Sequence, residues 1–170
     1  MWVLTNQISR DGRAMGKQRR HGSSDVLVDE LYDTTTELRT YVEGRLRPLG
    51  ASVARLRALR ILAREGVPLR MRDLSEMLGV AARTTTAIVD GLERDGLVER
   101  VRHPEDRRAF LLSLTDAGRG HHAEAEAEDA RALAVATGTL ETAEREQLRT
   151  LLAKIRDAVG EAAGDASPER

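Results

Sequence analysis

A short polar stretch in the middle of the chain carries side chains suited to contacting a nucleic acid. Arg83 is followed by three consecutive threonines and then by Ala87. Hydroxyl and guanidinium groups near the start of a helix can donate to phosphates, meet thymine methyl groups or reach base edges in a major groove. Because three threonines weaken a helix, their place at its start indicates a role outside the fold. We therefore expect DNA contacts from Arg83, Thr84, Thr86 and Ala87, with Arg83 as the best candidate for a base contact.

A second polar cluster follows some 20 residues later, at the predicted tip of a hairpin. It contains Asp106, Arg107 and Arg108, and Pro104 lies two residues before Asp106. An arginine at such a tip can enter a minor groove, where narrow A·T-rich segments concentrate negative potential. Asp106 could hold that arginine extended. The alternative is an exposed tip with a local ion pair that contributes under about 1 kcal/mol.

Two helices joined by a tight turn must position the first cluster. The turn is predicted at Gly79, because a glycine just past the last periodic apolar residue can close a helix in the left-handed conformation. The preceding helix, 71–78, has its apolar residues at helical spacing, and the following helix, 82–94, has a buried face opposite the polar one. These two predicted apolar faces consist of Met71, Leu74, Met77 and Leu78, and of Thr85, Ile88, Val89 and Leu92.

Two strands must position the second cluster. Residues 97–102 and 109–114 are rich in branched and apolar side chains, and Asp95-Gly96 separates them from the helix before. We expect Phe110, Leu112 and Leu114 on one face of the second strand. The extended piece 67–69 could add a third strand. The pattern predicts a helix-turn-helix with a wing.

This whole stretch, LSEMLGVAARTTTAIVDGLERDGLVERVRHPEDRRAFLLSLTDAGR, resembles the winged helix-turn-helix of the MarR (multiple antibiotic resistance regulator) family. The resemblance includes D-x-R at the wing tip and L-T-x-x-G before the next helix. It covers about residues 25 to 160 in element order and is most specific from Leu74 to Gly118. The resemblance implies a homodimer whose second motif helix lies in the major groove and whose Arg108 lies in the minor groove. The chain departs from the family pattern at Ala81, Ala82 and Ala87, where the family often has serine or a basic residue.

The rest of the chain is predicted to be helical, so the expected fold class is mainly α (α+β), a winged helix-turn-helix head with a helical dimerisation platform. Apolar periodicity and caps predict helices at 25–46, 53–65, 116–136 and 142–162. Ser52 and Thr115 are expected to cap the second and third of these helices.

We assign 25–50 and 116–162 to the platform and 51–115 to the head, and we expect disorder in the basic extension 1–24 and the tail 163–170. Three interpretations of residues 1–24 stay open. The segment could be a basic arm that contacts DNA, it could be a solvated tail, or the true start of the protein could be Met15.

The last helix carries an apolar stripe that has little core left to cover, so a second copy of the chain is its expected partner. A two-fold dimer would place two recognition helices about 34 Å apart, and its operator would be a pseudo-palindrome in double-stranded DNA. The expected dimerisation residues are Leu31, Leu148, Leu151, Leu152, Ile155 and Val159.

The family resemblance also implies a repressor released by a small-molecule effector that binds between platform and head. Such a ligand releases DNA only if it prefers a head spacing that misfits the operator. The residues implied are Leu38, Tyr41, Val42, Leu56 and Leu59, and core packing explains most of them equally well.

Amino-acid composition excludes several kinds of site and switch. The chain has 170 residues, no cysteine and a net charge of -1, which excludes disulfides, cysteine-ligated zinc and a thiol switch. Between Arg70 and Arg108 the sequence contains eight arginines and eight acidic residues. Because these charges balance, we expect modest nonspecific affinity for DNA. No apolar run approaches the roughly 18 residues of a membrane span, and no signal peptide is visible, which predicts a cytoplasmic protein.

Three other functional classes fit the sequence less well. The near-neutral head allows a protein-interaction module without DNA binding. An enzyme is not expected, because the chain has no glycine-rich phosphate loop, nucleophile elbow or apolar carboxylate pair, and no cofactor is expected either. A metal-responsive regulator would use His122 with His121, Glu126 and Asp129, but a solvated charged face is favoured and no metal site is assigned.

Overall fold

The computed structural model describes residues 25–106 and 109–165, and it is mainly helical with one small antiparallel sheet. Its packing divides the chain into two compact units, one ending at Thr36 and one beginning at Glu37. The expected fold class is confirmed. The elements are α1 (Val26–Leu46), the 3-10 turn η1 (Arg47–Leu49), α2 (Val53–Glu65), β1 (Leu69–Arg70), α3 (Met71–Leu78), α4 (Ala82–Arg94), β2 (Val98–Arg102), β3 (Phe110–Leu114), α5 (Asp116–Ala136) and α6 (Thr142–Asp165).

Local signals in the sequence set several of these boundaries. The Ser52 hydroxyl accepts a hydrogen bond from the Arg55 amide at 3.2 Å, and the Thr115 hydroxyl accepts one from the Gly118 amide at 2.9 Å. Both bonds satisfy amides that have no partner within the first turn of a helix. Gly79 ends α3 with φ +66°, a conformation that side chains with a Cβ rarely adopt. The two predicted caps and the predicted turn glycine are therefore confirmed.

The sheet has the order β1-β3-β2, and both pairings are antiparallel. Leu69 of β1 lies opposite Leu112 of β3, so a third strand is present, at Leu69–Arg70 and not at the expected 67–69. On the other side of β3, Val98 lies opposite Leu114 and Arg100 lies opposite Leu112. Opposed side chains in an antiparallel pair point to the same face, so Val98, Arg100 and Leu112 share one face.

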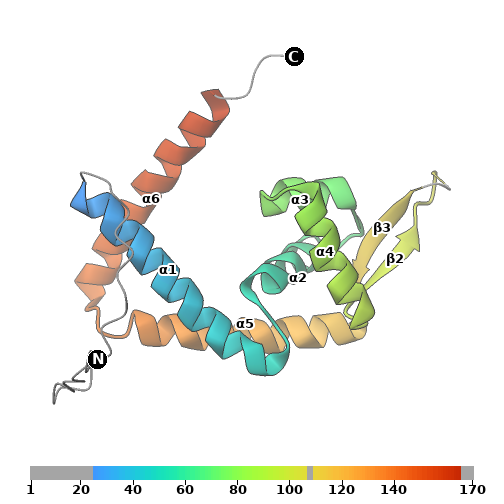
Figure 1. The fold of residues 1–170 in the computed structure, drawn as a ribbon, viewed down its shortest axis with the longest axis horizontal. Helices are drawn as coiled ribbons and strands as arrows, with labels where there is room; N and C mark the ends of the chain where they lie inside the picture. Colours follow the sequence, from blue (N-terminus) through green and yellow to red (C-terminus); the bar gives the residue numbers. More distant parts are fainter. Residues whose placement is uncertain (1–24, 107–108, 166–170) are drawn as a thin grey trace, which may run out of the picture. The chain divides into compact units, whose positions relative to one another are not determined.

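The head has a single aliphatic core formed by α2, α3, α4 and the sheet (Figure 1). Leu59, Leu74, Val89 and Leu92 are completely buried in it. The sheet contributes Leu69, Val98, Leu112 and Leu114. This core holds the motif helices and the base of the β2–β3 hairpin in one rigid arrangement.

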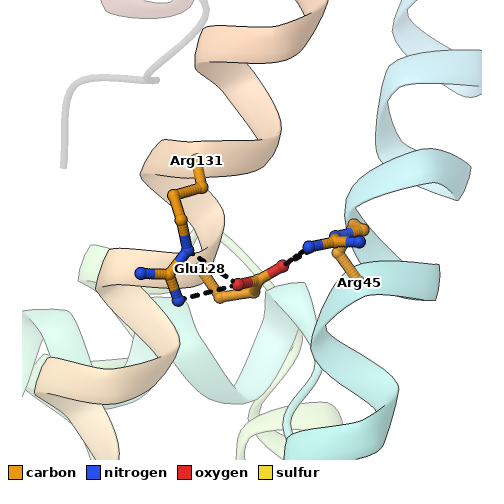
Figure 2. A network of polar contacts seen from close by, with 3 residues as sticks. All are labelled: Arg45, Glu128 and Arg131. Carbon is orange, nitrogen blue, oxygen red and sulfur yellow. Dashed lines mark hydrogen bonds and ion pairs between the residues drawn. The ribbon is translucent and has the colours of Figure 1, made fainter.

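A second cluster joins the end of α1 and the start of α2 to α5, which lies along α2 in Figure 1. Its buried members are Val42, Leu46, Ala51, Leu56, Ala125 and Ala132. Glu128 of α5 lies beside this cluster and accepts hydrogen bonds from Arg45 of α1 and Arg131 of α5 (Figure 2). Arg60 of α2 reaches α5 as well, where it pairs with Glu126 at 2.8 Å and Asp129 at 2.9 Å.

Several expectations about single residues need correction. Phe110 shares a face of β3 with Leu112 and Leu114 as expected, but it is 49% exposed, because it lies at the end of the hairpin away from the core, where Arg102 stands 6.0 Å from its ring centroid. Met77 is 40% exposed, because the face of α3 that packs inward carries Leu74 and Leu78.

The predicted boundaries also shift. β2 begins at Val98 and β3 at Phe110, each one residue later than expected. α6 continues to Asp165, past the expected end at Ala162, since Ala162 and Ala163 favour helix and Gly164 does not end it. Residues 163–165 are thus helical, which corrects the expected start of a disordered tail. The expected disorder of 1–24 and of 166–170 lies outside the described residues. Within the described parts of the chain, no helix is both long and apolar enough to cross a bilayer.

Candidate nucleic-acid interface

The first turns of α4 present a small polar surface to solvent. Arg83, Thr84, Thr86 and Ala87 are exposed there, whereas Thr85 is completely buried between them. No side chain caps α4, whose N-cap residue is Ala81. The free amides of that first turn and the Arg83 guanidinium are therefore available donors at the same end of the helix. We name the four exposed residues the α4 surface.

Buried hydrogen bonds set the angle at which α4 leaves the turn. The Thr85 hydroxyl donates to the Ser75 hydroxyl at 3.0 Å, and Ser75 in turn donates to the carbonyl of Val80 at 3.1 Å. This chain joins α3, the turn after Gly79 and α4, so one threonine of the triplet belongs to the fold. Helical periodicity predicted that Thr85 is buried, but it did not predict the bond to Ser75. A serine beside the apolar positions of a short helix was the available signal.

An ion pair holds the other end of α4. Asp95 follows the last residue of the helix and pairs with Arg55 of α2. The hydrogen bond from Arg55 holds the pKa of the Asp95 carboxyl below its usual range. The lowered pKa shows that the pair favours the ionised carboxylate, and the pair links the end of α4 to α2.

The wing begins as an ordered turn at its base. His103 Nδ1 accepts from the backbone amides of Glu105 and Asp106, both at 3.2 Å. Arg70 of β1 places a guanidinium nitrogen 3.1 Å from the other ring nitrogen of His103. Arg107 and Arg108 lie outside the described residues, so the expected minor-groove arginine and its support by Asp106 stay a prediction.

One basic residue on the wing side of this surface was missed by sequence reasoning. Arg100 of β2 donates to Asp90 at 2.6 Å and to Glu93 at 2.8 Å, and both acids belong to α4. The available signal was an arginine two residues after Val98, on the core-facing side of a strand.

The residues expected at an effector site do not share one environment. Val42 and Leu56 pack in the cluster beside α5, whereas Leu59 packs in the core of the head. Leu38 is half-buried, and Tyr41 is 40% exposed. The three buried side chains are therefore core residues, as the sequence analysis favoured for most of the set.

The acidic partners of the histidine pair are already engaged. Arg60 binds Glu126 and Asp129, and His122 Nε2 lies 3.5 Å from Glu126. Among the residues that the structure describes, no group of three or more histidine, aspartate or glutamate side chains could hold a metal ion. These side chains form part of the α2–α5 contact.

The apolar stripe on α6 is exposed in the single chain. Leu148, Leu151, Leu152, Ile155 and Val159 are between 40% and 63% exposed, and Leu31 of α1 is exposed as well. Rows of exposed aliphatic side chains are typical of surfaces that bind another molecule.

A helix-turn-helix packed on a three-stranded sheet, with an exposed polar start to its second helix, defines a winged helix-turn-helix protein. A model of the MarR family matches residues 52–110, which include this motif. Over these residues the chain has the winged helix-turn-helix of the MarR family, which is a family of transcriptional regulators.

The relatives of the chain include regulators from Bacillus subtilis. It is 34% identical to the HTH-type transcriptional regulator YfiV over 68 residues, which are 40% of this chain and 42% of YfiV. It is 30% identical to the HTH-type transcriptional repressor YetL over 99 residues, which are 58% of this chain and 59% of YetL. The chain thus spans about half the length of these curated relatives.

Solved structures match over more of the chain. The transcriptional repressor CouR bound to a 23-mer DNA duplex is 28% identical, with a TM-score of 0.69 over 77% of this chain and 92% of that one. CouR from Rhodococcus jostii RHA1 bound to p-coumaroyl-CoA is 24% identical, with a TM-score of 0.68 over 86% of this chain and 97% of that one.

Proposed function

We propose that the chain is a transcriptional repressor that binds a pseudo-palindromic DNA operator as a homodimer. The observation that carries this proposal is the α4 surface, four exposed residues on the first turns of a helix fixed at both ends. A rigid helix that presents a guanidinium and hydroxyls at its start suits insertion into a major groove. The similarity to YetL, a repressor, and to CouR, which has been solved on a DNA duplex, supports the proposal.

The test is selection of duplexes from random and genomic DNA by the full chain, followed by titration of the enriched duplex. We expect Arg83→Ala to weaken binding by about 1–3 kcal/mol, the usual cost of losing a base contact. Arg64→Ala is the matched control, because Arg64 is exposed on α2 and forms its ion pair with the neighbouring Glu65. A chain that enriches no duplex even at low salt would favour the protein-interaction module instead.

We also propose that a small-molecule effector releases the DNA. The CouR structure with p-coumaroyl-CoA supports this part. The ligand would have to prefer one spacing of the two heads over another, since equal affinity for both states shifts nothing. Titrating p-coumaroyl-CoA as a probe into the complex with the enriched duplex should lower DNA affinity. Unchanged DNA affinity together with a raised melting temperature would show that the compound binds without controlling DNA release.

A metal-responsive regulator is less well supported. Glu126 and Asp129 would have to give up Arg60 before they could bind a metal with His122. Adding Zn²⁺ during titration of the enriched duplex tests directly whether a metal changes DNA affinity.

A further inference from the structure

The exposed side of α4 carries an acidic residue among the groups proposed to face DNA. Asp90 lies seven residues after Arg83, which is about two turns of helix, so both side chains project from the same face. The Asp90 side chain is 48% exposed. Glu93 follows one turn later, with 40% of its side chain exposed. Two carboxylates so close to the α4 surface would repel the phosphates of a bound duplex.

Arg100 reaches this acidic pair from the wing. The residue shares a face of the sheet with Val98 and Leu112, the face that packs onto the helices, so its side chain must run along α4 to reach solvent. Nη2 of Arg100 contacts Asp90 at 2.6 Å, and Nε contacts Glu93 at 2.8 Å. One guanidinium thus binds both acids across the turn that separates α4 from β2.

These contacts have two physical consequences. Arg100 reduces the charge of the cluster from −2 to −1. It also ties the base of the wing to the recognition helix, because its backbone is fixed by pairing with Leu112 while its side chain is fixed by α4. A duplex that is to receive the helix in one groove and the wing in the next requires this relative position to be kept.

We infer that Arg100 is a positioning residue for DNA recognition, which acts by neutralising Asp90 and Glu93 and by holding the wing against α4. This inference rests on the proposed DNA-binding function. It assigns to Arg100 a role exerted through α4 and not through a direct contact with the duplex.

The experiment compares variants on the duplex most enriched by the wild-type chain. Arg100→Gln should weaken binding roughly tenfold, at the lower end of the effect of losing a base contact. Adding Asp90→Asn to Arg100→Gln should recover most of that loss, because the exposed carboxylate is removed. Arg64→Gln changes the net charge by the same amount and should bind like the wild type, since Arg64 pairs with Glu65 on α2. Thermal unfolding of each variant checks that the head stays folded.

The outcomes separate this inference from the proposed function. Failure of the wild-type chain to bind any enriched duplex overturns the function itself. Wild-type binding with an unaffected Arg100→Gln variant overturns only the role of Arg100. A tenfold loss that Asp90→Asn does not rescue, with a shallower dependence on salt, shows that Arg100 contacts a phosphate directly and likewise overturns the positioning role.

Discussion

At the scale of single residues, Gly118 shows how much one missing atom can matter. Gly118 is buried in the first turn of α5, and its amide donates to the capping Thr115. A Cβ built on Gly118 would lie 1.9 Å from the carbonyl oxygen of Leu97 and 3.1 Å from a methyl of Leu114. The helix can therefore pack against the start of the wing only if this position has no side chain. That is the physical reason for the glycine of the L-T-x-x-G motif in this chain.

We predict that Gly118→Ala destabilises the chain, although alanine normally favours a helix. Relieving the clash requires a backbone shift, and overpacking of this kind costs about 1–3 kcal/mol or more. Gly120→Ala is the control in the same helix, because nothing lies within 4 Å of its added Cβ. The control should gain about 0.5–1 kcal/mol. Urea denaturation measures both variants, and a Gly118→Ala protein as stable as the control would contradict this packing.

Single residues also form the Arg100–Asp90–Glu93 contact and the Arg55–Asp95 pair. Exposed ion pairs contribute little to stability, typically below about 1 kcal/mol. Their importance here lies in where they hold α4. Arg83→Ala tests a proposed contact with DNA, and Arg100→Gln tests a proposed support of that contact.

At the scale of elements, one carboxylate adds a polar contact to the apolar packing between α1 and α5. Glu128 is 9% exposed, and Arg131 and Arg45 both donate to it (Figure 2). Hydrogen bonds from Arg131, and next from Arg45, hold the pKa of Glu128 below its usual value of 4.5. A carboxyl whose pKa is lower in the folded than in the unfolded chain stabilises the fold above its unfolded pKa. That contribution is lost as pH falls through the lowered folded pKa.

We therefore predict an acid-sensitive contribution from Glu128. Glu128→Gln should be less stable than the wild type at neutral pH, and the difference should shrink as pH falls below 4.5. Glu124→Gln, an exposed glutamate on the same helix, is the control. Melting temperatures over this pH range provide the measurement. A constant difference at every pH would mean that shape, and not the charge of Glu128, holds the two helices.

At the scale of the whole molecule, the proposed operator requires a dimer. The stripe on α6, from Leu148 to Val159, is exposed in the described chain, and aliphatic rows of this kind are usually covered in the assembled protein. A second copy of the chain would cover it and bring two α4 surfaces onto one duplex. Binding of both half-sites in one event multiplies the affinity far beyond that of a single head.

We predict that Leu152→Asp yields a monomer. A carboxylate in the middle of an aliphatic interface must be desolvated without a partner, which opposes association. Thr150→Asp places the same charge on the other side of α6, where Thr150 is exposed, and should stay dimeric. Sedimentation equilibrium distinguishes the two, and titration of the enriched duplex should show weaker binding for Leu152→Asp alone. A dimeric Leu152→Asp chain would require another interface.

Much of the fold could be predicted because its signals are local. The caps at Ser52 and Thr115, the turn at Gly79 and the periodicity of α4 depend on neighbours within a few residues, and the structure has each of them as expected. Of the candidate site, the same periodicity separated buried Thr85 from exposed Arg83, Thr84 and Thr86. DNA contact by these residues and by Arg108 stays a prediction.

The sequence by itself therefore determined the order of the elements, the family and the surface proposed to face DNA. Only the tertiary structure decided that Ser75 bonds Thr85, that Phe110 lies beyond the core, and that Arg100 pairs with two acids of α4. It also showed why Gly118 can have no side chain. These features depend on contacts between segments that are separated in the sequence. A local pattern of residue types therefore predicts neither the distance between Arg100 and Asp90 nor the approach of Leu97 to Gly118.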